Sequence, residues 1–222
     1  MKPTQPDTLP AGDFSLWLSQ TSQTLKSKSG DMSVPCGDCT ACCKSSLFVH
    51  IKPDETKTIE QIPKELLFPV PGLPHGHVLM GYDELGKCPM FQNNQCSIYE
   101  FRPRTCREFD CRIFAATGVE MNNDAQAMIV ERARRWVFEY PADSDRSDHS
   151  ALRATVSFLR DHKSLFPAQF VPANPTQFAL LAIKVFRVFE EKNETSDNTD
   201  RPRSDAQIVS RVLEAVANFA TV

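Results

Sequence analysis

The chain has 222 residues, of which 41% are hydrophobic and 24% charged, and this composition suits a globular protein with a conventional apolar core. Its formal net charge of -3 gives no case for nucleic-acid binding. No stretch approaches about eighteen consecutive apolar residues, so we expect no membrane-spanning helix.

The N-terminal sequence MKPTQPDTLPAGDFSLW lacks the apolar run of a secretory signal. We therefore expect the protein to stay in the reducing cytoplasm. In that compartment, eight cysteines favour metal binding or redox chemistry over four structural disulfides.

The first half of the chain has few regular segments. Residues 1–13 are predicted to be a disordered lead, and 14–28 a short helix. The run SSLFVHI, residues 45–51, predicts one short strand. From Val34 to about Phe114 the sequence is loop-rich and cysteines recur in it, as expected where ligand bonds replace part of an apolar core.

After Gly118 the pattern becomes helical. A helix is predicted from an Asn123 cap to Tyr140 and is stopped by the proline that follows. Residues 141–150 are predicted to be a polar loop. A second helix is predicted from the apolar stripe over 152–159.

Two further helices are predicted near the C-terminus. Asn174 and Pro175 cap and begin a segment that is apolar nearly all round, which predicts a buried central helix. Residues 193–204 are predicted to be a flexible acidic linker. The last helix is predicted to begin at Ser204, with Gln207 completing a capping box.

The predicted fold class is mainly α, with a loop-rich, metal-organised cysteine-cluster core and little β. We expect three regions along the chain. Residues 1–33 are an N-terminal arm with a short helix, 34–118 the cysteine-cluster metal-binding region, and 119–222 a helical region that packs on it.

The cysteines form two groups, the first with the spacing C-x2-C-x2-C-C. A C-x2-C turn brings two thiolates onto one centre, and the intervening backbone amides can offset their charge. The first three cysteines also have a spacing that iron–sulfur clusters use. The eight predicted metal ligands are Cys36, Cys39, Cys42, Cys43, Cys88, Cys96, Cys106 and Cys111.

The adjacent pair Cys42 and Cys43 indicates more than a single zinc finger. Neighbouring residues tend to send their side chains in different directions, so this pair is an awkward chelator of one ion. The two side chains are expected to reach two neighbouring centres, or two irons of one cluster. Eight thiols could fill two four-thiolate sites, or one cluster with some cysteines left over as buried apolar residues.

Charged and imidazole side chains add candidates around the cysteines. The second group lies among Arg102, Arg104, Arg107 and Arg112. These arginines could stabilise an anionic thiolate centre, form a solvated basic turn or bind an anion. His75 and His77 could supply nitrogen ligands or bases, although exposed loop positions are the default for both, and His50, next to the predicted strand, is a slightly better candidate by position. Glu108 and Asp110 could supply oxygen ligands, although surface charge is the default for them.

The motifs CGDCTACCK, GKCPMF and QCSIYEFRPRTCREFDCR resemble the bacterial YkgJ-type cysteine-cluster family, which is described as a zinc- or iron-chelating domain and named for its CxxCxxCC signature. The resemblance covers roughly residues 34–114. It implies that all eight cysteines occupy the family's cysteine positions, and it leaves the metal open. A relative in this family, the flagellin lysine N-methylase, uses S-adenosylmethionine and is thought to hold an iron–sulfur cluster.

The leading hypothesis is a cytoplasmic metal-binding protein whose cysteine cluster holds an iron–sulfur cluster or Zn, with a redox or metal-handling role. The alternative implied by the resemblance is an S-adenosylmethionine-dependent protein-lysine N-methyltransferase, although no G-x-G-x-x-G follows a predicted strand. A thiol–disulfide enzyme using Cys39 and Cys42 ranks third, because the βαβ context is missing. Enzymatic activity is therefore undecided. The expected partners are a metal ion or cluster and a protein substrate or redox partner, with neither nucleic acid nor membrane.

Overall fold

The computed structural model describes residues 7–27, 34–121, 124–170, 172, 174–190 and 204–220. Helix makes up 55% of the structure and strand 12%, which confirms a mainly α fold with little β. The predicted Asn123 cap, the greater part of the predicted linker and the first residues of the predicted lead lie outside the described residues.

The chain divides into two compact units that are not consecutive in sequence. Unit 1 comprises Met1–Ser29, Cys111–Glu120 and Ala133–Val222, and unit 2 comprises Gly30–Asp110 and Met121–Arg132. Residues 34–110 of the expected cysteine-cluster region therefore belong to unit 2.

Unit 1 holds most of the long helices. Its elements are β1 (Leu9–Asp13), α1 (Phe14–Ser27), α4 (Arg112–Thr117), β7 (Trp136–Glu139), α6 (Asp143–Asp161), η5 (Lys163–Leu165), η6 (Ala168–Phe170), α7 (Pro175–Val185), α8 (Arg187–Glu190) and α9 (Asp205–Ala220).

Unit 2 consists of short elements joined by turns. They are η1 (Cys42–Lys44), β2 (Val49–Ile51), α2 (Thr56–Glu60), η2 (Lys64–Leu66), β3 (Leu67–Pro69), β4 (Val78–Met80), β5 (Phe91–Gln92), β6 (Gln95–Cys96), η3 (Tyr99–Phe101), α3 (Arg104–Glu108) and η4 (Asp124–Gln126). Helix α5 (Ala127–Arg134) begins in unit 2, and its last two residues belong to unit 1.

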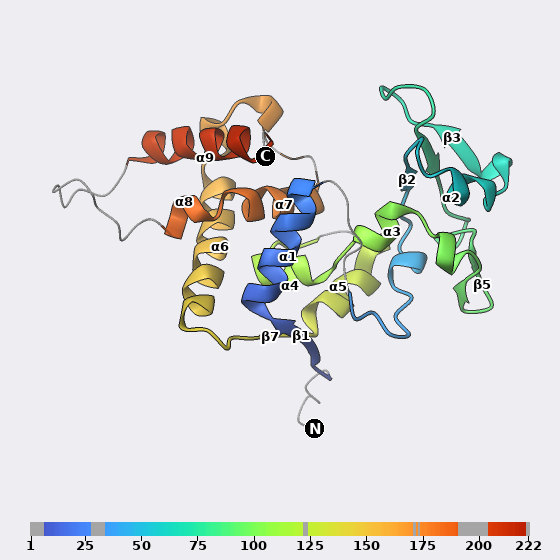
Figure 1. Ribbon diagram of the computed structural model, residues 1–222, viewed down its shortest axis with the longest axis horizontal. Helices are drawn as coiled ribbons and strands as arrows, with labels where there is room; N and C mark the ends of the chain where they lie inside the picture. Colours follow the sequence, from blue (N-terminus) through green and yellow to red (C-terminus); the bar gives the residue numbers. More distant parts are fainter. Residues whose placement is uncertain are drawn as a thin grey trace. The chain divides into compact units, whose positions relative to one another are not determined.

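Helix α7 is the central helix of unit 1, as its apolar sequence predicted. It contacts α1, α4, α6 and α9 (Figure 1). The Asn174 side chain accepts a hydrogen bond from the Gln177 N–H at 2.9 Å, and Pro175 stands at the first helical position. The predicted helix does not run on unbroken, because a turn at Phe186 separates α7 from α8.

The last helix is also confirmed. Gln207 Oε1 accepts a hydrogen bond from the Ser204 N–H at 2.9 Å, and the Gln207 N–H donates to Ser204 Oγ at 3.4 Å, which is the predicted capping box. Val209 and Val212 of α9 are buried in unit 1.

Strand β7 corrects the prediction that one helix runs to Tyr140. Trp136 and Phe138 are buried while Val137 and Glu139 are exposed, an alternation with the period of a strand. Strand β7 pairs in parallel with β1, so the predicted disordered lead is also wrong for residues 9–13. Each strand finds its backbone hydrogen-bond partners on the other, so the sequence of either segment alone does not predict the pairing.

Helix α6 begins inside the segment that was predicted to be a polar loop, residues 141–150. Asp143 and Asp145 lie in its first turn, where carboxylates are favoured by the helix dipole. Asp145 is fully buried, and its Oδ2 accepts a hydrogen bond from the Ala142 N–H at 3.0 Å. The polar residues of this segment therefore cap the helix or lie on its exposed surface.

Replacing Asp145 with Ala should lower the free energy of unfolding by about 1–2 kcal/mol, because the start of α6 loses the acceptor for the Ala142 N–H. Denaturant unfolding followed by circular dichroism measures the change. Asp143→Ala is the matched control, because Asp143 is exposed in the same helical turn, and it should change stability by less than about 0.5 kcal/mol. Equal losses in the two variants would contradict the capping role of Asp145.

Candidate metal centre

Seven of the eight cysteines lie in unit 2, and Cys111 lies in unit 1. In unit 2, Cys36, Cys42 and Cys106 are exposed, whereas the other four are partly buried. The four partly buried cysteines are Cys39, Cys43, Cys88 and Cys96.

The first cysteine group is held by turns. The Cys39 N–H donates to Cys36 O at 3.0 Å, and Gly37 takes the left-handed conformation that this turn requires, with a φ of 55°. Arg132 Nη2 donates to Cys36 O at 3.1 Å, which anchors the start of the motif to α5 within unit 2. Cys42 and Cys43 then open η1, one exposed and the other partly buried, as expected for adjacent side chains that diverge.

A backbone hydrogen bond joins the two cysteine groups. The Cys88 N–H donates to Cys43 O at 2.8 Å, and the Phe91 N–H donates to Cys88 O at 2.9 Å. Cys96 lies on β6, directly opposite Phe91 on β5. Cys88 and Cys96 both pack against the apolar core of unit 2. Segments far apart in the sequence thus place Cys43, Cys88 and Cys96 in one neighbourhood.

Glu55 fixes the helix that carries Cys106. Its side chain is buried, with 6% of its surface exposed. Its Oε2 accepts a hydrogen bond from the Lys52 N–H at 2.8 Å, and its Oε1 accepts one from the Arg104 N–H at 2.5 Å. One carboxylate therefore ties the turn after β2 to the first residue of α3.

Two more contacts hold α3 beside β2, a pairing that Figure 1 shows. Arg104 Nη2 donates to Asp54 Oδ2 at 2.7 Å, and Thr105 Oγ1 donates to His50 O at 2.7 Å. The salt bridge lowers the pKa of Asp54, chiefly through the Arg104 hydrogen bond. Cys106 follows directly in the sequence and is therefore carried on an anchored backbone.

The thiols of unit 2 lie within electrostatic reach of one another. Burial raises the pKa of Cys43 to about 11, and the thiols of Cys88, Cys96 and Cys39 add to the rise. Burial also raises the pKa of Cys106 to about 12, with contributions from Cys88, Cys43 and Cys96, although this residue keeps solvent-exposed surface. Burial is likewise the largest cause that raises the pKa of Cys88. A thiolate at one of these positions would disfavour a thiolate at the next, and we call Cys43, Cys88, Cys96 and Cys106 the thiol group because of this mutual influence.

The side chains of this group are of a type that binds thiophilic metals, but their arrangement does not form a metal site. Zinc and iron both accept thiolate ligands. Over the described stretches of the chain, however, no three His, Cys, Asp or Glu side chains come together in a group that could hold a metal ion. The metal-organised core expected from the sequence is therefore not shown by the arrangement of these side chains.

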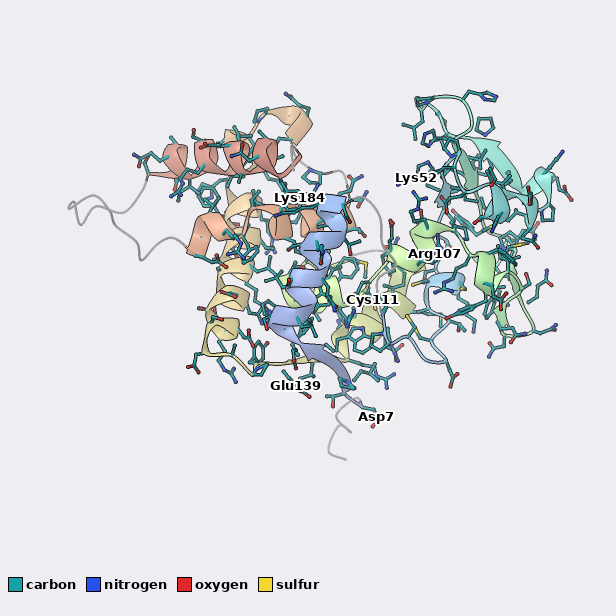
Figure 2. All side chains as sticks on the ribbon, in the orientation of Figure 1. Asp7, Lys52, Arg107, Cys111, Glu139 and Lys184 are labelled. Carbon is teal, nitrogen blue, oxygen red and sulfur yellow. The ribbon has the colours of Figure 1, made fainter. Side chains whose placement is uncertain are left out.

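Cys111, labelled in Figure 2, stands at the start of α4 in unit 1. It is 7% exposed, and its Sγ accepts a hydrogen bond from Trp136 Nε1 at 3.1 Å. Its place among the metal ligands stays a prediction.

The arginines of the second group have separate surroundings. Arg102 lies over the Tyr99 ring, 4.1 Å from its centroid, and its charge offsets part of the rise that burial causes in the pKa of Cys106. Arg104 pairs with Asp54, as described above. Arg112 is buried in unit 1, where its Nη1 donates to Ala11 O at 2.9 Å. Arg102 therefore lies within electrostatic reach of the Cys106 thiol.

His50 and His77 form a pair that the sequence did not predict. His50 Nε2 and His77 Nδ1 are 2.9 Å apart, and the two rings stack with centroids 5.1 Å apart. Burial, followed by the neighbouring His77 and Lys52, lowers the pKa of His50. His75 is exposed, as expected for a loop histidine.

Residues 35–127 match the family model CxxCxxCC, described as "Putative zinc- or iron-chelating domain". This match confirms the resemblance that the cysteine motifs carry, and it supports a general metal-binding role with zinc or iron. No curated protein and no solved structure matches the chain. Among the described residues, none of the helices has the length and apolar character needed to cross a membrane.

Replacing Glu55 with Ala should lower the free energy of unfolding by about 2–4 kcal/mol, because two backbone N–H groups lose a charged acceptor. Glu55→Gln keeps a carbonyl oxygen and should lose less. The matched control is Glu60→Ala, an exposed glutamate at the end of α2 that should change stability by less than about 0.5 kcal/mol. Denaturant unfolding of the full chain measures the free energy of unfolding of all three variants. A loss of stability in Glu55→Ala as small as that in Glu60→Ala would contradict the role of the two Glu55 hydrogen bonds.

The His50–His77 pair should make stability depend on pH. Because the pKa of His50 is lowered in the folded state, its contribution is complete above the ordinary histidine pKa and is lost as the pH falls through the lowered value. Unfolding midpoints measured from about pH 8 to pH 5 should therefore fall more steeply in the wild type than in His50→Gln. Parallel curves for the two proteins would contradict this assignment.

Proposed function

We propose that unit 2 binds zinc or iron through cysteine thiolates and that the first centre consists of Cys43, Cys88, Cys96 and Cys106. One observation carries this proposal: early and late cysteines share one neighbourhood, joined by the Cys88 N–H···O Cys43 hydrogen bond of 2.8 Å. Cys36, Cys39, Cys42 and Cys111 remain predicted ligands of the same or a second centre.

The electrostatics of the group favour a cation. Crowded thiols in a desolvated site resist deprotonation, as the raised pKa values of Cys43 and Cys106 indicate. A bound cation reverses this balance, because it stabilises the thiolates it contacts. A bound metal would therefore supply the positive charge that stabilises the thiolates, which the protein alone does not provide.

Zinc bound here would cross-link the segments that carry the four cysteines, whereas an iron–sulfur cluster would supply a one-electron redox centre. The chain's own contribution is the same in both cases. Glu55 and Thr105 hold α3, the β5–β6 turn holds Cys96, and η1 presents Cys43. We propose a redox or metal-handling role in the reducing cytoplasm, where thiols remain available as ligands.

Elemental analysis of the full chain, purified without oxygen, tests the proposal. The wild type should carry zinc or iron, and Cys43→Ser and Cys106→Ser should each retain less than about half of that metal, because each removes one ligand of a four-thiolate centre. A brown solution would indicate iron and a colourless one zinc.

Ser97→Ala is the control for local damage near the site. Ser97 Oγ donates to Met90 O at 3.0 Å and supports the β5–β6 turn without offering a thiol. This variant should keep the wild-type metal content. A metal-free wild type, or cysteine variants with unchanged metal content, would contradict the proposed centre.

A further inference from the structure

The small sheet of unit 2 has two different faces. Its strands have the order β2-β4-β3, with Val49 and Leu67 both opposite Met80. These three residues pack in the apolar core of unit 2. Because side chains alternate along a strand, the neighbours of these residues lie on the other, outer face.

Three aromatic residues form a cluster on and beside this outer face, which we call the aromatic cluster: Phe48, Phe68 and Tyr82. Their exposed fractions are 56%, 40% and 41%. The Phe48 ring lies 6.0 Å from Phe68 at nearly a right angle, and 5.1 Å from Tyr82. A Cβ at Gly81 would lie 3.6 Å from both phenylalanine rings, so the two rings flank this glycine.

A closed turn holds Tyr82 in place. The Asp83 N–H donates to Lys87 O at 2.8 Å, and Asp83 Oδ1 accepts hydrogen bonds from the N–H groups of Leu85 and Lys87 at 2.9 and 2.8 Å. Asp83 and Glu84 are exposed and follow Tyr82 directly. Two carboxylates therefore stand next in the chain to exposed aromatic rings.

Elsewhere the protein places its own cations over aromatic rings. Arg102 lies over Tyr99, Lys44 over Phe91 and Arg146 over Tyr140, at 4.1, 5.0 and 4.7 Å from the ring centroids. Within the described parts of the chain, no Lys or Arg takes such a position over a ring of the aromatic cluster. The cluster thus offers exposed, electron-rich rings, with the carboxylates of Asp83 and Glu84 next to Tyr82 in the chain and no Lys or Arg of the described residues over a ring.

We propose that the aromatic cluster is a docking site for a Lys or Arg side chain of a partner polypeptide. The exposed rings supply cation–π attraction, and the neighbouring Glu84 supplies charge complementarity. The surface is distinct from the thiol group, since it uses the outer face of the sheet while Cys88 and Cys96 pack against the core. This role therefore goes beyond metal binding and does not depend on it.

Fluorescence anisotropy of the full chain with a dye-labelled peptide of five arginines tests the proposal. The probe is compared with the peptide of five citrullines, which keeps the shape of the side chain and removes its charge. We expect the citrulline peptide to bind at least about 10-fold more weakly. Phe48→Leu and Phe68→Leu keep apolar volume but lose the ring, and each should raise Kd about 3- to 10-fold.

Phe101→Leu is the matched control, because Phe101 is also 40% exposed and lies outside the cluster. It should leave Kd unchanged, and all three variants should keep the metal content of the wild type. Unchanged Kd values for Phe48→Leu and Phe68→Leu, or equal binding of the citrulline peptide, would overturn the proposal. Self-association of the chain that Phe48→Leu abolishes would also overturn it, because the occupant would then be a second copy.

Discussion

The hydrogen bond from the Cys88 N–H to Cys43 O is the contact that joins the two cysteine groups of unit 2 directly, residue to residue. A second backbone hydrogen bond, from the Ser46 N–H to Gly86 O at 2.9 Å, joins the same two segments. Backbone groups make both contacts, so they require no particular side chain and leave the Cys43 and Cys88 thiols available as ligands. Glu55 completes the arrangement by tying α3, with Cys106, to the turn after β2.

The thiol group is costly for the protein without a cation. Burial and, to a lesser extent, neighbouring thiols raise the pKa of Cys43 and Cys106, so these two side chains favour the neutral thiol over the thiolate. Unit 2 has a small apolar core of its own, formed around Ile51, Met80 and Met90, which holds the backbone of the thiol-bearing segments. Because this core orders the backbone of these segments, a cation that binds the proposed centre would need to order mainly the cysteine side chains.

Local sequence predicted the elements whose signals are local. The Asn174 cap, the capping box at Ser204 and the helix over 14–28 all appear, because each depends on residues within one or two turns. The β1–β7 pairing could not be predicted from either strand, since each strand's hydrogen-bond partners lie on the other. The polarity of residues 141–150 predicts a loop, whereas α6 begins at Asp143, because these polar residues lie in the first turns and on the exposed side of the helix.

The candidate site shows the same division between local and distant signals. The cysteine spacing predicted a metal-binding segment, and the family match over 35–127 confirms that reading at the level of the domain. The grouping of Cys43 with Cys88, Cys96 and Cys106 depends on tertiary contacts that spacing does not encode. Glu55 belongs to no sequence motif, because its role depends on hydrogen bonds from two backbone N–H groups that are far apart in the chain.

The small sheet of unit 2 also has a feature that depends on strand geometry. Because side chains alternate along a strand, one face of the sheet packs in the apolar core and the other carries exposed rings. Because the outer rings are exposed and the residues opposite Met80 are packed in the core, a change to an outer ring leaves the core face of the sheet intact.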